Sequence, residues 1–104
     1  MQENRRLELH EKFCELLGSR NVYFQPPESI RMKYPAIRYN LTPGDTRYAD
    51  NGVFIYKRRY EVTVIEKDPD IPWDEKMLGA FEYCSFERAY PAENLNHWQF
   101  SLYY

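Results

Sequence analysis

The sequence has few of the residues that most often carry catalysis or metal binding. Two cysteines, Cys14 and Cys84, and two histidines, His10 and His97, occur among its 104 residues. Two cysteines are too few for a disulfide scaffold, so we expect both thiols to be reduced. The four glycines are scattered and form no phosphate-binding loop. These absences argue against a disulfide-stapled domain and against a nucleotide-binding protein.

Long apolar runs and an excess of positive charge are also missing. No run approaches the roughly 20 apolar residues of a membrane-spanning helix, and residues 1–6 lead into no apolar signal segment. Fourteen basic and sixteen acidic residues leave a net charge of −2, which does not indicate a dedicated nucleic-acid binder. We therefore expect a cytosolic chain that is not held in a membrane.

Aromatic residues are present in surplus. Ten tyrosines, six phenylalanines and two tryptophans make up 17% of the chain. Aromatic side chains are enriched in strands, and Tyr and Trp are also favoured on surfaces that are half buried against a partner. The two interpretations are compatible, and both remain open at this point.

Two helices are predicted. Apolar side chains recur at helical spacing over residues 3–17, and Gly18 is placed to end that helix. A short helix is expected at residues 72–78, because Pro72 and two acidic residues occupy its first turn and Gly79 follows it.

Five strands are predicted, at residues 22–24, 34–40, 54–66, 81–90 and 97–104. In the third, one face collects Tyr60, Val62 and Val64, and the other collects Glu61, Thr63 and Ile65. In the last strand, one face collects Trp98, Phe100, Leu102 and Tyr104. The chain length fits one domain. We therefore expect a single α+β domain over residues 1–104, with a mainly antiparallel sheet of about four or five strands in the order α-β-β-β-α-β-β.

A projecting hairpin is expected at about residues 40–60. Residues 42–52 hold two turn-forming clusters, Pro43-Gly44-Asp45 and Asp50-Asn51-Gly52. The strand that follows is charged in its first half and alternates cleanly in its second. That pattern is expected of a strand that extends beyond the body of the domain.

The two histidines and two cysteines suggest one hypothesis, a metal site. His10 and Cys14 stand at i and i+4 on the first helix, a spacing that metal ligands use. Cys84 and His97 would complete four ligands if the last two strands cover that helix. Against this, cysteine is among the most buried residue types, and no CxxC or HExxH motif occurs. We expect no metal and no cofactor.

Catalytic groups are equally sparse. The neighbours of Cys84 include no base that would activate its thiol. The acidic residues near the second helix are explained as a solvated capping cluster, which comprises Asp68, Asp70, Asp74 and Glu75. We therefore expect a protein that binds other surfaces and is not an enzyme.

The basic run Lys57-Arg58-Arg59 is the one patch with a possible binding role. It would contact a phosphate backbone together with nearby tyrosines, form an Arg- and Tyr-rich protein interface, or protect a strand edge from pairing. Replacing all three residues with Ala is expected to leave folding nearly unchanged. The residues predicted to contact a partner are Arg47, Tyr48, Tyr56, Lys57, Arg58 and Arg59.

Several blocks in order along nearly the whole chain resemble a family of small tail-terminator-like neck proteins, found in tailed phages and prophages of Gram-positive bacteria. The blocks are Val22-Tyr23-Phe24-Gln25-Pro26-Pro27, Lys33-Tyr34-Pro35-Ala36-Ile37-Arg38-Tyr39, Tyr48-Ala49-Asp50-Asn51, Tyr60-Glu61-Val62-Thr63-Val64-Ile65, Asp68-Pro69-Asp70, Cys84-Ser85-Phe86, Asn94-Leu95-Asn96-His97 and Leu102-Tyr103-Tyr104. Glu93 and Trp98 replace aspartates of the family pattern, so no fixed role is carried over for an acid beside His97.

The resemblance implies a virion protein that assembles in the host cytoplasm. Such a protein would form a homo-hexameric ring that caps the tail tube and joins it to head-completion proteins. Its partners would be its own copies, the tail tube protein and a head-completion protein, with possible non-specific contact to DNA in the lumen. Two other functions stay open: a head-completion stopper or adaptor, and a small DNA-contacting connector.

Overall fold

The computed structural model describes residues 2–47 and 57–104. Its elements in chain order are α1 (Gln2–Leu17), β1 (Val22–Phe24), β2 (Ala36–Arg47), β3 (Lys57–Glu66), α2 (Trp73–Ala80), β4 (Cys84–Ala92) and β5 (Leu95–Tyr103). The predicted α+β class and the order α-β-β-β-α-β-β are confirmed. The predicted contact residues Tyr48 and Tyr56 lie outside the described residues.

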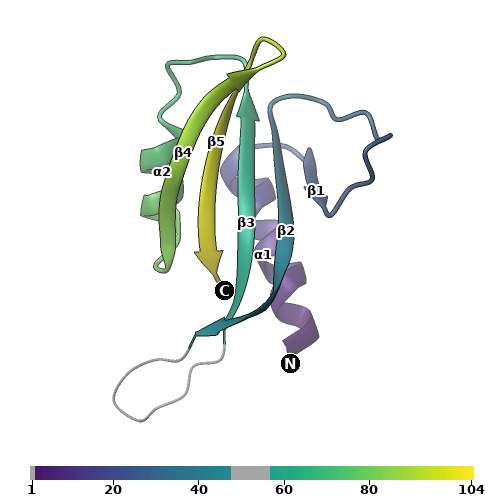
Figure 1. The fold of residues 1–104 in the computed structure, drawn as a ribbon, viewed down its shortest axis with the longest axis vertical. Helices are drawn as coiled ribbons and strands as arrows, with labels where there is room; N and C mark the ends of the chain where they lie inside the picture. Colours follow the sequence, from purple (N-terminus) through teal and green to yellow (C-terminus); the bar gives the residue numbers. More distant parts are fainter. Residues whose placement is uncertain (1, 48–56) are drawn as a thin grey trace.

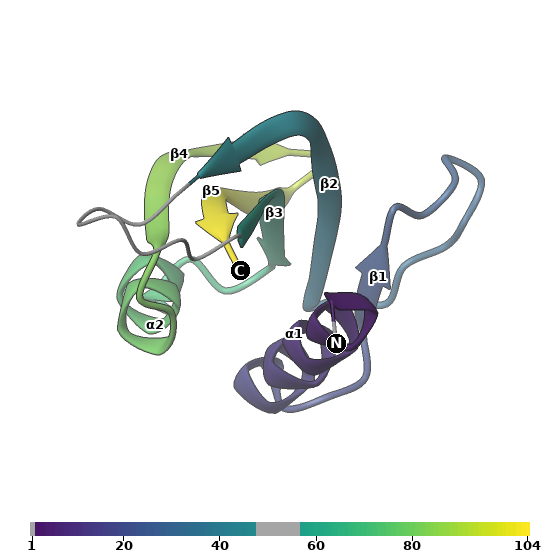
Figure 2. The same ribbon diagram turned by 90° about the horizontal axis from the view of Figure 1, so that it is seen from below.

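The five strands form one mixed sheet in the order β1-β2-β3-β5-β4. β1 runs parallel to β2, and the other three pairings are antiparallel. Both helices lie on the same side of the sheet (Figures 1 and 2), and within residues 2–47 and 57–104 no element covers the other face. Strands β1 and β4 occupy the two edges, so the sheet ends in two chemically different borders.

The first helix ends where the sequence predicts. Leu9 and Phe13 are fully buried on its inner side. Gly18 has a φ of +83°, and its N–H donates to the carbonyl of Cys14 at 2.9 Å. A residue in this left-handed conformation commonly closes a helix, and glycine adopts it without steric cost.

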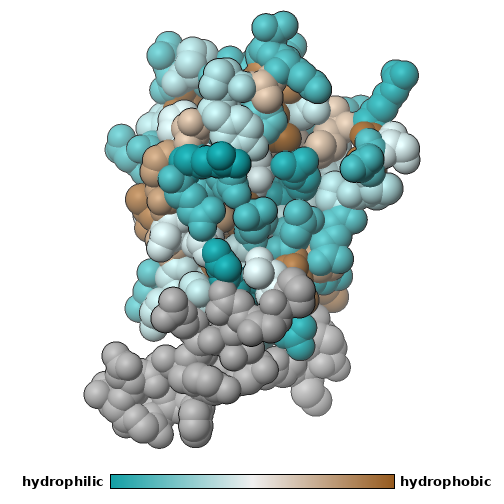
Figure 3. Space-filling model, viewed as in Figure 1, coloured by the Kyte–Doolittle hydropathy of each residue, from teal (hydrophilic) through white to brown (hydrophobic). Residues whose placement is uncertain are grey.

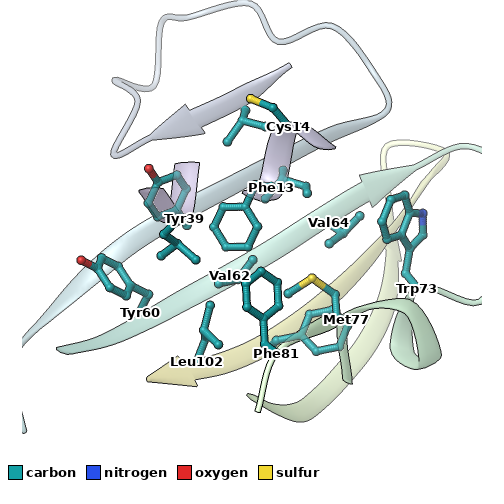
Figure 4. Close-up of a cluster of buried hydrophobic side chains, with 14 residues drawn as sticks. Phe13, Cys14, Tyr39, Tyr60, Val62, Val64, Trp73, Met77, Phe81 and Leu102 are labelled. Carbon is teal, nitrogen blue, oxygen red and sulfur yellow. The ribbon is translucent and has the colours of Figure 1, made fainter. Parts of the chain in front are cut away.

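The core fills the space between the two helices and the sheet (Figure 4). Phe13 of α1 packs edge-on against Tyr39 of β2 and against Phe81 after α2, with ring centroids 5.0 and 5.4 Å apart. Trp73 and Met77 bring α2 into the same cluster. Burial of this many large side chains is the main source of stability for a domain of this size.

One buried polar contact fixes the start of α2. The carboxylate of Glu66 accepts a hydrogen bond from Trp73 Nε1 at 3.3 Å, and it accepts another from the backbone N–H of Asp68 at 3.2 Å. Glu66 is 6% exposed. A buried carboxylate needs such donors, so the end of β3 and the start of α2 are held together.

The strand boundaries at the last hairpin differ from the prediction. β4 continues through Pro91 to Ala92, and only Glu93 and Asn94, with φ of 52° and 64°, form the turn. Positive φ at both central residues is typical of a type I′ hairpin turn. The sequence predicts a strand that ends at residue 90, just before Pro91, but an edge strand tolerates proline. Phe81, predicted as strand, instead caps α2 and is buried.

β2 is longer than predicted. The strand expected at residues 34–40 begins at Ala36 and runs to Arg47, and its register against β3 shifts between Leu41 and Thr46. The irregular register accommodates Pro43 and Gly44, the residues that led us to predict a loop from residue 42. Thr46 is paired with Arg58 and Arg47 with Lys57, so β2 and β3 form a ladder up to Arg47 and Lys57.

The predicted division of β3 into two faces is confirmed, and the second face is more buried than its composition suggests. Tyr60, Val62 and Val64 line the core as expected. On the other face, Thr63 and Ile65 are also buried, with 5% and 2% exposure, whereas Glu61 is exposed. β3 is the middle strand of the sheet, so its side chains are covered by neighbours on both sides.

Candidate interaction surface

The predicted basic run divides into two parts. Arg47 and Lys57 are paired in register at the end of the β2–β3 ladder, and the next residue of β3, Arg58, is exposed. Arg59 instead points across the sheet: its Nε donates to Ser101 Oγ at 2.8 Å, and its guanidinium lies 3.6 Å from the Glu87 carboxylate. Arg59 is therefore only partly exposed, at 29%, and its side chain belongs to the sheet surface.

The helix-free face of the sheet is covered by linked polar side chains. Arg88 Nε donates to Gln99 Oε1 at 3.0 Å, and the Arg88 guanidinium lies 4.8 Å above the ring of Tyr90. Tyr90 stacks on His97, with ring centroids 5.0 Å apart and planes 15° apart. Figure 3 shows this face, which is mainly hydrophilic. His97 is therefore part of a β4–β5 stack and lies on the opposite face of the sheet from the helix that carries His10.

His10 belongs to a hydrogen-bonded group around Tyr39. Its Nδ1 lies 2.8 Å from the Tyr39 hydroxyl, which also accepts a hydrogen bond from Arg6 Nη1 at 3.4 Å. Because Arg6 donates to this hydroxyl oxygen, the hydroxyl hydrogen can be donated to an unprotonated Nδ1. Burial, and then the positive charges of Arg6 and Arg20, lower the pKa of His10. Neutral His10 thus satisfies a hydroxyl buried in the core.

Neither thiol has the environment of a nucleophile. Burial raises the pKa of Cys14, and it raises the pKa of Cys84 to about 11. A protonated thiol is a poor nucleophile and a poor metal ligand. Across residues 2–47 and 57–104, no three His, Cys, Asp or Glu side chains are grouped to hold a metal ion.

The inter-helix groove is a shallow hollow of about 330 Å³. Lys12, Glu15 and Leu16 of α1 line one side, and Ala80 and Phe81 line the other. It contains one acid and one base, both on exposed positions of the same helix. The groove therefore has no buried polar group that would orient a small ligand.

Exposed apolar side chains gather at the border formed by β4 and α2. Leu78, Tyr83 and Phe86 are 46%, 45% and 41% exposed. Phe86 lies 5.5 Å from Phe100 between ring centroids, so it covers the end of the core only partly. Figure 3 shows a hydrophobic area along the side of the molecule where β4 lies.

The opposite border carries a second, smaller apolar group. β1 has only three residues, and the connection from β1 to β2 extends outward from it (Figure 1). Ile30 and Tyr34 in this connection are 40% and 39% exposed. Its path is tied back by the N–H of Lys33, which donates to the Tyr23 hydroxyl at 3.1 Å, and by the N–H of Ile30, which donates to the carbonyl of Pro27.

These two borders were not located from the sequence. The aromatic surplus is compatible with both strand filling and partner surfaces, and Tyr39 and Tyr60 are core residues. One sequence signal could have located the first border. Leu78 and Phe86 are large apolar residues in addition to those that the core pattern requires. Five of the six large apolar side chains that are exposed in the described ranges lie at these borders, and the sixth is Leu7 on α1.

The described residues include no helix long and apolar enough to cross a membrane. No family model matches the chain, and no curated protein or solved structure matches it either.

Proposed function

We propose that the chain is a structural subunit of the neck of a tailed phage, a tail terminator that forms a ring on the end of the tail tube and joins it to head-completion proteins. The sequence blocks that resemble this family run in order along the chain, and parts of all five strands fall within them. The partners are further copies of the chain, the tail tube protein and a head-completion protein.

The observation that carries this proposal is the pair of unlike borders of the sheet. A cyclic assembly larger than a dimer needs head-to-tail contacts, in which one surface of each copy meets a different surface of the next. Exposed apolar residues are present at both the β4 border and the β1 border, and these lie on opposite sides of the molecule in Figures 1 and 2. The domain therefore has the two separate adhesive surfaces that a ring requires.

A structural role also agrees with the state of the polar groups. The two thiols are held protonated by burial, and His10 is engaged with Tyr39. On the helix-free face, Arg59 donates to Ser101 and Arg88 donates to Gln99. These groups stabilise the fold, and none is left in the arrangement that acid–base or nucleophilic catalysis requires.

A DNA-contacting connector is the second candidate, and one observation favours it. Arg47 and Lys57 are paired in register at one end of the sheet, and the next residue of β3, Arg58, is exposed. Three basic residues at one tip would contact phosphates of DNA that passes through a ring. The same tip would serve a head-completion protein that contacts DNA without forming the terminator ring.

The test is to measure the mass of the purified full-length chain by native mass spectrometry, alone and with purified tail tubes. We expect a closed ring of several copies, six in the family expectation, and we expect tubes whose ends carry that ring in electron micrographs. A chain that stays monomeric under both conditions, leaves the tubes uncapped and binds DNA with a steep salt dependence would overturn the proposal in favour of the connector.

A further inference from the structure

We infer that the β4 border of each copy docks on the β1 border of the next copy, through opposite charges that surround apolar contacts. This inference rests on the proposed ring and adds the two surfaces that form it. The acidic border is defined as residues 73–94, which comprise α2 and β4 with their flanking turns. The basic border is defined as residues 18–38, which comprise β1 and its connection into β2.

Charge separates the two borders sharply. The acidic border has five carboxylates and two cations, a net charge of −3, while the basic border has four cations and one carboxylate, a net charge of +3. Glu87 and Arg20 already form ion pairs with Arg59 and Glu11. When Glu87 is left out, the acidic border has four carboxylates and two cations, a net charge of −2. When Arg20 is left out, the basic border has three cations and one carboxylate, a net charge of +2.

This polarity is informative because the whole chain is nearly neutral. A net charge of −2 over 104 residues could be spread evenly, but here the sheet has one negative side and one positive side. Complementary potentials favour the contact of unlike borders, and contact between like borders places like charges together. The charge pattern therefore favours head-to-tail assembly over a two-fold dimer.

The apolar residues lie within the same two borders. Leu78, Tyr83 and Phe86 are exposed on the acidic border, and Ile30 and Tyr34 are exposed on the basic border. An apolar centre with a charged rim is the usual organisation of a protein interface. Phe86 is the best anchor, because its ring already rests on Phe100 and its exposed side is free to enter a partner surface.

Prolines limit how the two backbones can pair. Pro91 lies in β4, Pro26 and Pro27 follow the short strand β1, and Pro35 directly precedes β2. Proline cannot donate to a strand ladder and blunts an edge against indiscriminate pairing. The docking contact therefore depends mainly on side chains, which makes it sensitive to charge reversal.

Charge reversal provides the test. The variant R31E/K33E carries acidic charge at both borders, and the variant E75K/E82K carries basic charge at both. All four positions are exposed, so both variants should keep the native fold, as checked by circular dichroism and thermal unfolding. We expect each variant alone to associate roughly tenfold or more weakly than the native chain at low salt.

The mixture is the decisive measurement. An equimolar mixture of the two variants restores opposite charges at every contact, so we expect it to form rings with an even number of copies in which the variants alternate. The fourfold variant R31E/K33E/E75K/E82K exchanges the signs of charge of the two borders, so it should assemble without a second variant. K67E, which reverses an exposed lysine in the turn after β3, is the control and should assemble like the native chain.

The apolar centre has its own test. F86S and I30S should each weaken assembly, whereas L7S, which removes a similarly exposed apolar side chain from α1, should not. If the native chain forms rings and caps tubes but charge reversal and F86S leave assembly unchanged, the docking inference is wrong and the proposed function stands. If the native chain forms no rings and caps no tubes, the proposed function is wrong, and the docking inference that rests on it is overturned with it.

Discussion

Trp73 donates its indole N–H to the carboxylate of Glu66, 3.3 Å away, and both side chains are buried. The second tryptophan of the chain is in the opposite situation. The Nε1 atom of Trp98 is buried and has no hydrogen-bond partner within the part of the chain that the structure describes. The two residues thus form a natural pair for comparison.

We predict that Trp73→Phe lowers the free energy of unfolding by about 2–4 kcal/mol, because it removes a hydrogen bond to a buried carboxylate and leaves a cavity. Trp98→Phe should cost at most about 1 kcal/mol, because the donor that it deletes is unsatisfied. Urea unfolding of both variants checks this. Equal losses of unfolding free energy in the two variants would show that the hydrogen bond to Glu66 contributes no stability beyond the packing of the Trp73 ring.

We expect alanine to have opposite effects on stability at the two described glycines outside β2. Gly18→Ala should destabilise the domain by about 1 kcal/mol, because φ at this position is +83°. Gly79→Ala should stabilise it by up to about 1 kcal/mol, because Gly79 lies in α2 and an added Cβ meets nothing within 4 Å. Thermal unfolding of the two variants measures the difference, and a stabilising Gly18→Ala would contradict the assigned helix end.

Acid should weaken the fold through His10. Its pKa in the folded chain lies below the ordinary value of 6.5, so folding favours the neutral ring. This contribution is fully present above pH 6.5 and is lost as the pH falls through the lowered pKa. Protonation would also place a donor against the Tyr39 hydroxyl, which already accepts from Arg6.

We therefore predict that the native chain is less stable to urea at pH 5.5 than at pH 7.5. His10→Gln should reduce this difference and His97→Gln, the matched control in the β4–β5 stack, should leave it in place. A difference that survives His10→Gln unchanged would assign the pH dependence to other groups.

Single substitutions in the basic run should have different effects on stability. Arg58→Ala should change the free energy of unfolding by less than about 0.5 kcal/mol, because the side chain is exposed. Arg59→Ala should cost about 1 kcal/mol, because it removes the bonds to Ser101 and Glu87. If Arg58 contacts DNA or a neighbouring protein, Arg58→Ala will lower infectious yield without lowering stability.

Local signals in the sequence were enough for the elements and their order. Period and capping located α1 and α2 to within a few residues, and turn chemistry separated the strands. Two boundary errors involve proline: the turn signals at Pro43 and Pro91 predict strand ends, but an irregular register in β2 and an edge position in β4 make room for them. The error at Phe81 has another cause, because this residue ends α2 and is buried.

The candidate surface was beyond reach because exposure depends on strand order. Phe86 and Phe100 have similar local patterns, yet Phe100 is fully buried on β5 and Phe86 is 41% exposed on β4. The difference arises because β5 lies between β3 and β4, which leaves β4 at the border. No periodicity within either segment contains that information. Similarly, Arg59 differs from Arg58 through a cross-strand partner 42 residues away.

The position of β5 has a consequence for synthesis of the protein. This strand is the last in the sequence but lies between β3 and β4, so those two strands cannot join one sheet until the ribosome has released β5. Until then β4 has no partner, and the apolar side chains that face β5 remain in water. The β4 border therefore takes shape only after β5 has been synthesised and has paired with β3 and β4, and a chain that lacks β5 would not carry this border.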